Sequence, residues 1–114
     1  MHIDSYSFGS MTVDGKTYSS DLIGFPDRII SDWWRAEGHS LAVEDIEEIL
    51  DYHPDVLVVG KGDIGLMSVS RETAEELEKQ GITLIQDRTG RAVRLFNEEI
   101  KKGRRVIGAF HLTC

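Results

Sequence analysis

Apolar residues in the second half of the chain recur with two different periods. Between Val43 and Leu50 they stand three or four positions apart with acidic residues between them, which is typical of an amphipathic helix. The segment 56–59 is continuously apolar, as in a strand that is covered on both faces. The two patterns alternate to the end of the chain. The expected helices cover 43–52, 71–80 and 90–102, and the expected strands cover 56–59, 82–86 and 106–112.

The first 35 residues favour β-structure. Short apolar and polar alternations surround Asp14-Gly15, a turn dipeptide whose glycine tolerates the positive φ of a tight hairpin. A further short strand over 21–25 ends at Pro26, and the β-branched and aromatic run 28–34 is typical of an extended segment. A loop follows this run and leads into the first helix.

These patterns predict one α/β domain over residues 1–114, a length that is usual for a single domain. Helix–strand alternation over 42–114 predicts an α/β core, in which a parallel or mixed sheet carries the three helices. The β-hairpin layer of residues 1–35 forms either an antiparallel extension of that sheet or a second small layer.

Charge is unevenly distributed along the chain. There are 13 basic and 20 acidic residues, a formal charge of −7, which argues against generic binding to nucleic acid or to anionic lipid. The net charge is −9 over residues 1–57 and +2 over residues 58–114. Seven of the bases lie within 88–105, where the acidic residues are Glu98 and Glu99.

Other features of composition restrict the class of protein. No apolar run approaches the roughly 18 residues of a membrane span, and the first ten residues lack the pattern of a signal peptide, so a cytoplasmic protein is expected. The single cysteine excludes a disulfide framework. Asparagine and glutamine number only three together, which leans towards a thermophilic source.

The glycine-rich segment Gly60–Gly65 matches the pattern G-x-G-x-x-G directly after a predicted strand. In dinucleotide-binding proteins the glycine turn opens straight into a helix whose N-terminus holds the pyrophosphate. Here four further residues precede Ser70, the expected cap of the next helix. A glycine loop that lets the chain turn at the strand end is therefore the favoured interpretation over dinucleotide binding.

A candidate anion site follows from the expected strand order. If strands 56–59 and 82–86 are parallel neighbours, the glycine loop and the start of the third helix meet at the edge of the sheet where ligands dock in open α/β folds. Backbone N–H groups and the helix dipole favour an anion there. The candidate residues are Gly60, Lys61, Gly62, Arg88, Thr89, Gly90, Arg91 and Asn97. The favoured alternative is that Arg88 and Arg91 pair with the many acids of residues 1–57.

Three further groups of residues have alternative interpretations. Asn97 lies beside the apolar stripe of the third helix and is expected to bond to a neighbouring loop rather than to face a pocket. Trp33 and Trp34 are adjacent, so one can enter the core while the other marks an exposed binding patch, although packing of both in the core or at its rim is favoured. The four histidines have no metal-ligand spacing and no catalytic set can be assembled, so no metal, cofactor or catalytic residue is proposed.

The order of these motifs resembles the adipogenesis-associated Mth domain-containing family, whose relatives include a mitochondrial assembly factor of respiratory complex I. Matching features include Asp14-Gly15 followed by Tyr18, the Gly60-x-Gly62 loop, Thr89-x-x-Ala92 and Gly103-Arg104. The resemblance implies a three-layer α/β fold with a central mixed sheet and an extra N-terminal antiparallel β layer. It implies no established enzyme activity and no cofactor. The mitochondrial relatives act by binding other proteins during assembly, a role that does not transfer directly to this chain because the expected mitochondrial presequence is absent.

Two function hypotheses remain open from the sequence. The first is a non-catalytic module that binds another protein. The second is an enzyme or sensor for a small anionic metabolite held at the Gly60–Gly62 loop and the Arg88–Arg91 helix start. The sequence does not indicate the oligomeric state.

Overall fold

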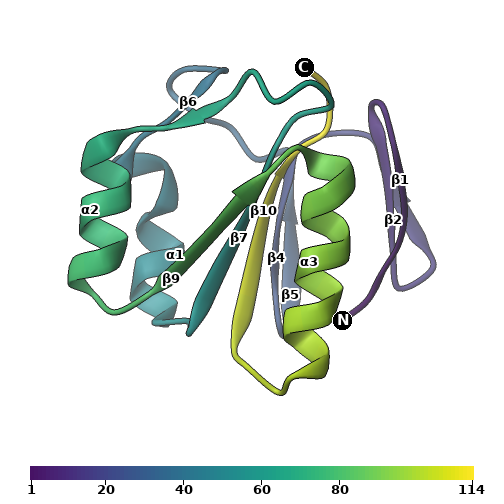
Figure 1. Ribbon diagram of the computed structural model, residues 1–114. Coiled ribbons are helices and arrows are strands. Elements are labelled where there is room, and N and C mark those ends of the chain that lie inside the picture. Colours follow the sequence, from purple (N-terminus) through teal and green to yellow (C-terminus); the bar gives the residue numbers. More distant parts are fainter.

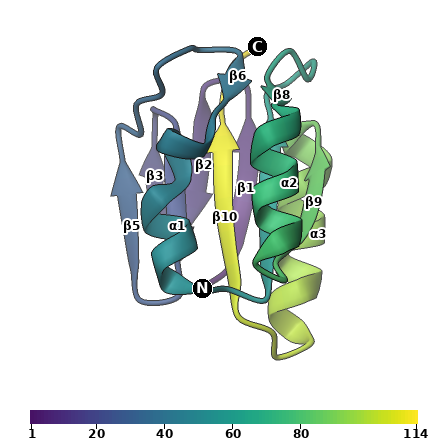
Figure 2. The same ribbon diagram turned by 90° about the vertical axis from the view of Figure 1, so that its left-hand side faces the viewer.

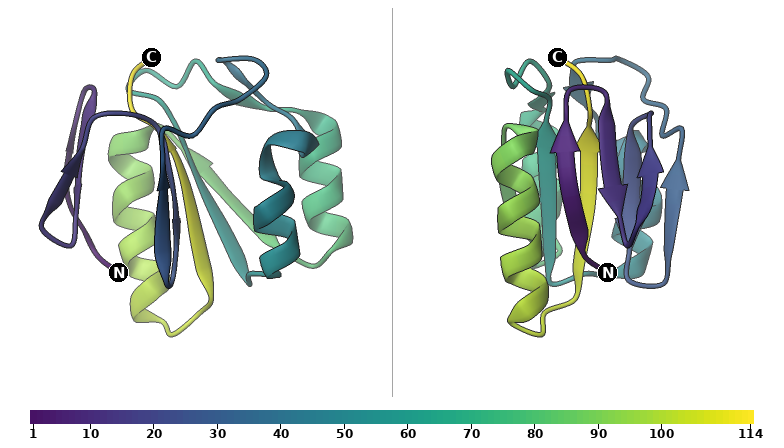
Figure 3. Two further views of the ribbon diagram at one scale, coloured as in Figure 1. Left: turned by 180° about the vertical axis from the view of Figure 1, so that it is seen from behind. Right: turned by 90° about the vertical axis from the view of Figure 1, so that its right-hand side faces the viewer.

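A computed structural model describes all residues 1–114 and shows a three-layer α/β arrangement (Figure 1). A five-stranded sheet forms the central layer. Helices α1 (Glu47–Tyr52) and α2 (Arg71–Lys79) cover one face, and helix α3 (Thr89–Lys101) lies beside a small antiparallel sheet on the other (Figure 3). The expected fold class is thereby confirmed, with its central mixed sheet, three helices and extra antiparallel β layer.

The central sheet is mixed and has the order β5-β4-β10-β7-β9. Strands β7, β9 and β10 are parallel, whereas β4 pairs antiparallel with both β10 and β5. Figure 2 shows β10 near the middle of this layer and β5 at one side. The bounds of these strands are β4 Leu22–Phe25, β5 Arg28–Ser31, β7 Val56–Lys61, β9 Thr83–Asp87 and β10 Val106–His111.

The N-terminal β-segment divides between two sheets. Strands β1 (Ile3–Ser7), β2 (Ser10–Val13) and β3 (Lys16–Tyr18) form the small sheet, while β4 and β5 extend the central one. Both arrangements that the sequence left open for residues 1–35 are therefore used. Two further strands that the sequence pattern does not reveal, β6 (Ser40–Leu41) and β8 (Ser68–Val69), pair in parallel with each other.

The sheet separates two apolar cores, because successive side chains of a strand point to opposite faces. Leu57 and Val59 pack with the residues of α1 and α2, whereas Val56 and Val58 pack with those of α3 and the small sheet. This explains why the run 56–59 contains no polar residue. None of the helices is long and apolar enough to span a bilayer.

Two expected elements differ in detail. The segment 43–52 is not one α-helix, because Val43–Ile46 form a 3₁₀ turn, η1, before α1 begins. The Asp45 carboxylate accepts the backbone N–H groups of Ala42 and Ala36, which holds this first turn tight. The extended run 28–34 ends at Ser31, because Asp32 adopts a positive φ of 56° and turns the chain off the sheet.

Candidate functional site

The glycine loop after β7 and the start of α3 lie against each other at the carboxyl edge of the sheet. Strands β7 and β9 are parallel neighbours, with Gly60 opposite Asp87. The backbone N–H of Thr89 donates to the carbonyl of Gly62 at 3.0 Å, and the N–H of Gly62 donates to the Thr89 hydroxyl at 2.9 Å. The juxtaposition on which the anion-site hypothesis depends is therefore present.

Thr89 does not cap α3 as its sequence position suggests. Arg88 is the residue that precedes the helix, and Thr89 is its first residue. The Thr89 hydroxyl instead donates to the backbone carbonyl of His111 at 2.6 Å, while it accepts the bond from Gly62. This buried side chain ties together the ends of β7 and β10 and the start of α3, so its role is structural.

The two first glycines of the loop are required by close packing. A Cβ atom on Gly60 would lie 2.8 Å from both the Phe110 ring and the Thr89 hydroxyl, and one on Gly62 would collide with the Cys114 carbonyl group. Gly62 also has a φ of 102°, which other residues rarely adopt. Helix α2 begins only at Arg71, so the loop lacks the helix start that dinucleotide binding needs.

A hollow of about 410 Å³ opens at the start of α3, and we call it the basic hollow. Arg91 Nε lies 3.4 Å from the Asp87 carboxylate, whereas Arg88 and Arg94 form no ion pair. The favoured alternative from the sequence, pairing of Arg88 and Arg91 with acids of residues 1–57, does not occur. The lining residues are Asp63, Asp87, Arg88, Gly90, Arg91 and Arg94.

Two sequence candidates lie outside the basic hollow. Lys61 alternates with Gly60 along β7, which directs its side chain to the face of Leu57 and Val59 rather than to the face of α3. Asn97 pairs with the edge of the small sheet: its amide group donates to the carbonyl of Ile3 at 2.9 Å and accepts from the N–H of Ile3 at 3.0 Å. Asn97 therefore has the expected structural bond, but its partner is strand β1 rather than a loop.

Tyr6 connects the small sheet to Asp63 at the basic hollow. Its hydroxyl donates to the carbonyl of Leu112 at 3.0 Å and lies 3.4 Å from a carboxylate oxygen of Asp63. Burial, together with the negative charge of Asp63, raises the pKa of Tyr6 to about 12. The phenol therefore remains neutral and serves as a hydrogen-bond donor.

A buried polar cluster that the sequence analysis missed joins Asp21, Arg35 and His111 beyond the end of β10. One carboxylate oxygen of Asp21 lies 2.9 Å from Arg35 Nη2 and 2.8 Å from His111 Nδ1, and the other accepts the backbone N–H of Leu112. The bond to Asp21 assigns the proton of a neutral His111 ring to Nδ1, because Asp21 only accepts. The Arg35 side chain is 4% exposed.

The electrostatic balance at Asp21 favours the ionised form. Burial raises the pKa of this carboxyl, but the bonds from the Leu112 N–H, His111 and Arg35 outweigh it, and the pKa lies below the ordinary value. The cluster attaches the 32–39 loop to β10. The one sequence signal for it was a histidine at the end of an apolar run, Val106–His111, where a buried polar group needs partners.

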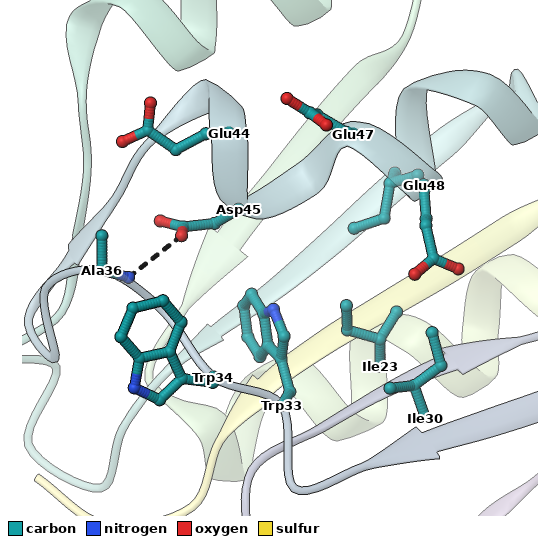
Figure 4. A pocket seen from close by; sticks show the side chains of 10 residues that line it. Ile23, Ile30, Trp33, Trp34, Ala36, Glu44, Asp45, Glu47 and Glu48 are labelled. Carbon is teal, nitrogen blue, oxygen red and sulfur yellow. Dashed lines mark hydrogen bonds between the residues drawn. The ribbon is translucent and has the colours of Figure 1, made fainter.

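A second hollow of about 400 Å³ lies between α1 and strands β4 and β5, and we call it the acid-rimmed groove (Figure 4). Ile23, Ile30 and Ile49 supply apolar walls, and the two tryptophans stand at one end. Four carboxylate residues of the η1–α1 segment form the rim. These are Glu44, Asp45, Glu47 and Glu48.

The two tryptophans have different environments. Trp33 is 8% exposed, lies under the Arg35 guanidinium at 4.7 Å, and has a buried indole N–H without an acceptor. Trp34 is 78% exposed. Packing of both residues in the core or at its rim was the favoured expectation, and it fails for Trp34. Beyond the turn at Asp32 the two adjacent side chains point to different sides, so that Trp33 enters the core while Trp34 is exposed at the groove.

Comparisons with known proteins agree with the fold. Residues 3–111 match the model of a protein family described as protein of unknown function (DUF498/DUF598). The conserved hypothetical protein PH1505 of Pyrococcus horikoshii is 30% identical over the whole of both chains, with a TM-score of 0.83. The Rpa2829 protein of Rhodopseudomonas palustris is 27% identical over 96% of this chain and 81% of that one, with a TM-score of 0.77.

A further solved structure is less similar in sequence. A protein of Bordetella pertussis, described as a Mth938-like domain, shares the fold at 22% identity, with a TM-score of 0.69 over 97% of this chain and 85% of that one. The family match covers nearly all of the sequence. This chain therefore belongs to the DUF498/DUF598 family, a group of proteins of unknown function.

Proposed function

We propose that this protein is a non-catalytic module that binds a basic segment of a partner protein in the acid-rimmed groove. One observation carries the proposal. An exposed tryptophan and four carboxylate residues line one apolar hollow, whose wall also contains Trp33 with a buried indole N–H that has no acceptor. The resemblance to a family with a respiratory-complex assembly factor points to the same class of function.

The groove offers contacts for both the basic and the apolar side chains of such a segment. Its isoleucine walls and the Trp33 ring can bury aliphatic side chains, and burial of apolar area is the main source of affinity. Tryptophan is enriched among the residues that dominate binding energy, and its ring face attracts ammonium and guanidinium groups. The carboxylates of Glu44 and Glu47 favour lysine or arginine over acidic partners.

Binding of defined peptides tests this proposal. We would titrate the protein with two fluorescein-labelled lysine-rich peptides, one with leucine at helical spacing and one alternating lysine with valine. Each has a glutamate analogue as control. At least one lysine peptide is expected to bind, and its glutamate analogue is not. Trp34→Ala and Glu47→Lys are each expected to weaken binding by about tenfold or more, the scale of one dominant interface residue.

Two control variants test whether loss of any exposed aromatic ring, or any change of net charge, weakens binding. Phe8 is exposed on the small sheet, so Phe8→Ala removes an exposed aromatic ring elsewhere. Glu98 is exposed on α3, so Glu98→Lys changes the net charge as much as Glu47→Lys does. Both controls are expected to bind like the original chain. Failure of both lysine peptides to bind, or equal losses in the control variants, would refute the proposal.

A second candidate function uses the basic hollow, where Arg88 and Arg94 have no ion-pair partner beside the N-terminus of α3. A sensor or enzyme for a small anion would use these charges. Inorganic phosphate at 100 times its dissociation constant would then stabilise the fold by about 2.7 kcal/mol. The stabilisation should disappear in the double variant Arg88→Ala/Arg94→Ala and persist in Arg71→Ala. No shift with phosphate would count against this candidate.

A further inference from the structure

Strand β5 leaves one side of the central sheet unpaired. It is the first strand in the order β5-β4-β10-β7-β9, and β4 is its only neighbour. A strand at such an edge presents a row of backbone N–H and C=O groups that another strand can pair with. Figure 3 shows β5 at the margin of the layer, with no other strand beside it on its outer side.

The register shows which backbone groups face outward. The loop between β4 and β5 has two residues, Pro26 and Asp27, so the flanking pair Phe25 and Arg28 exchange both hydrogen bonds. Opposite residues in an antiparallel pair alternate between bonded and unbonded pairs. The N–H and C=O groups of Ile29 and Ser31 therefore point away from β4, towards the free edge.

The free edge and the acid-rimmed groove are adjacent. Ile30 belongs to β5 and also lines the groove, and Glu48 of the groove rim reaches Arg28 at the start of β5 at 3.3 Å. A strand added beside β5 would direct every second side chain to the face that carries α1. Those side chains would meet the isoleucine walls and the carboxylates of the groove.

We propose that the partner's basic segment binds in an extended conformation as an added strand on β5, with alternate side chains entering the acid-rimmed groove. This inference rests on the proposed function and specifies how the segment is held. Backbone pairing with Ile29 and Ser31 supplies affinity that is independent of sequence, and the groove supplies the preference for basic and apolar side chains.

Charge argues for a foreign basic segment rather than a second copy of this chain. Pairing of β5 with β5 of another copy would bring two sets of the same four rim carboxylates to one interface, and like charges across an interface are unfavourable. Each copy also carries a formal charge of −7. A strand that carries lysine or arginine reduces the repulsion among the rim carboxylates, whereas a second copy of the chain increases it.

The closing experiment removes N–H groups from each side of the proposed pairing: one from the protein and every second one from the peptide. On the protein, Ser31→Pro deletes the outward donor of an exposed residue, and proline is tolerated at sheet edges. Thr17→Pro is the matched control, because Thr17 occupies the equivalent outward position on the edge strand of the small sheet after a two-residue loop. On the peptide, the alternating lysine–valine chain is N-methylated at every second residue, in each of the two frames.

The expected results follow from the pairing. Ser31→Pro and one of the two N-methylated frames weaken binding of the lysine–valine peptide by about tenfold or more, while Thr17→Pro and the other frame leave it unchanged. The N-methylated peptides keep the test valid even if Ser31→Pro fails to fold, since they do not alter the protein. Circular dichroism and the unfolding midpoint confirm that each variant retains its fold.

Four outcomes would overturn the inference. If only the helical lysine peptide binds, and Trp34→Ala abolishes that binding, the proposed function stands and strand addition is wrong. If the lysine–valine peptide binds equally well in both N-methylated frames, backbone pairing is absent. If the protein is a dimer that Ser31→Pro dissociates, a second copy fills the edge instead. Absence of binding by either lysine peptide refutes the proposed function and this inference together.

Discussion

The acid-rimmed groove and the basic hollow have similar volumes and opposite chemistry. The groove, between α1 and β5, has apolar walls and two tryptophans under a negative rim. The hollow, at the start of α3, is lined by six residues, none of them hydrophobic, and three of these are arginines. Apolar burial gives short-range affinity, whereas exposed charges are screened by salt within about 10 Å at 0.1 M ionic strength. The groove is therefore the better docking surface.

The two regions also differ in how they are held. One wall of the groove, Trp33–Ala36, is part of a loop that Arg35 anchors in the buried cluster with Asp21 and His111. The hollow is built on α3, where Thr89 bonds to two strand ends and Asn97 bonds to β1. Because different residues hold the groove and the hollow, a substitution can destabilise one of them and leave the other intact.

The largest expected effect comes from Asp21→Ala, which removes the acceptor of the buried cluster. Arg35 then keeps its buried charge without a carboxylate partner, although it retains its bond to the carbonyl of Gly38 and its contact with His111. This loss is expected to cost about 3 kcal/mol of unfolding free energy. Urea unfolding measures this loss. Peptide binding at the groove should fall with it, while any phosphate effect at the basic hollow remains.

Asp51→Ala is the control for this prediction, because Asp51 is an exposed carboxylate on α1 that forms no ion pair. Its effect should stay within about 0.5 kcal/mol. If Asp21→Ala lowers the unfolding free energy as little as Asp51→Ala does, the buried cluster does not hold the groove wall. The proposed difference in how the groove and the hollow are held is then wrong.

The next largest effect is expected from Asn97→Ala on the opposite side of the sheet. The substitution leaves the N–H and C=O groups of Ile3 without their partner, at a cost of about 2 kcal/mol. Hydrogen exchange should show faster opening of β1 and β2, whereas groove binding stays unchanged. The neighbouring exposed substitution Glu98→Ala serves as its control, and equal exchange in the two variants would contradict the prediction.

Acid should lower the unfolding free energy more through protonation of Asp21, which holds the groove loop, than through protonation of exposed carboxylates. Because the folded pKa of Asp21 lies below its unfolded value, Asp21 contributes stability above the unfolded pKa of about 3.9, and this contribution is lost as pH falls through the folded pKa. Unfolding free energies measured between pH 6 and pH 2 should therefore fall less steeply for Asp21→Asn than for the original chain. Asp51→Asn should keep the original slope, and parallel curves for all three proteins would refute this assignment.

The smallest effect on stability is expected from Trp34→Ala. Its side chain is 78% exposed, so the unfolding free energy should change by less than about 0.5 kcal/mol. The same variant should nevertheless lose most of its peptide binding. Calorimetric unfolding beside a binding titration separates the two effects, and a large loss of stability would show that Trp34 is a packing residue instead.

Much of the fold could be predicted from local patterns. The apolar run 56–59 is hydrophobic because both of its faces are covered, and Gly81 ends α2 with a positive φ of 74°, as a glycine after a helix commonly does. The adjacency of the Gly60 loop and the α3 start also follows from alternating helices and strands. The missed strands β6 and β8 have two residues each, too few to form a pattern.

The candidate sites were harder to predict, because they join residues that are far apart in the sequence. Asp21 and His111 are separated by 90 positions, and no local period links a carboxylate before one strand to a ring at the end of another. Hydrophobic patterning reports neither the turn at Asp32 that takes the chain off the sheet nor which of the two following tryptophans is exposed. Lys61 was expected in the loop after strand 56–59 and at the anion site, whereas it is the last residue of β7 and does not line the basic hollow.

The sequence by itself determined the α/β class, the order of its main elements and the separation of acidic and basic halves, because periodicity and composition act within a few residues. The tertiary structure decided which charges stay unpaired, which tryptophan is exposed and where an acidic rim meets an open sheet edge. These features depend on contacts between distant segments, whose energies come from burial and pairing that no single segment contains.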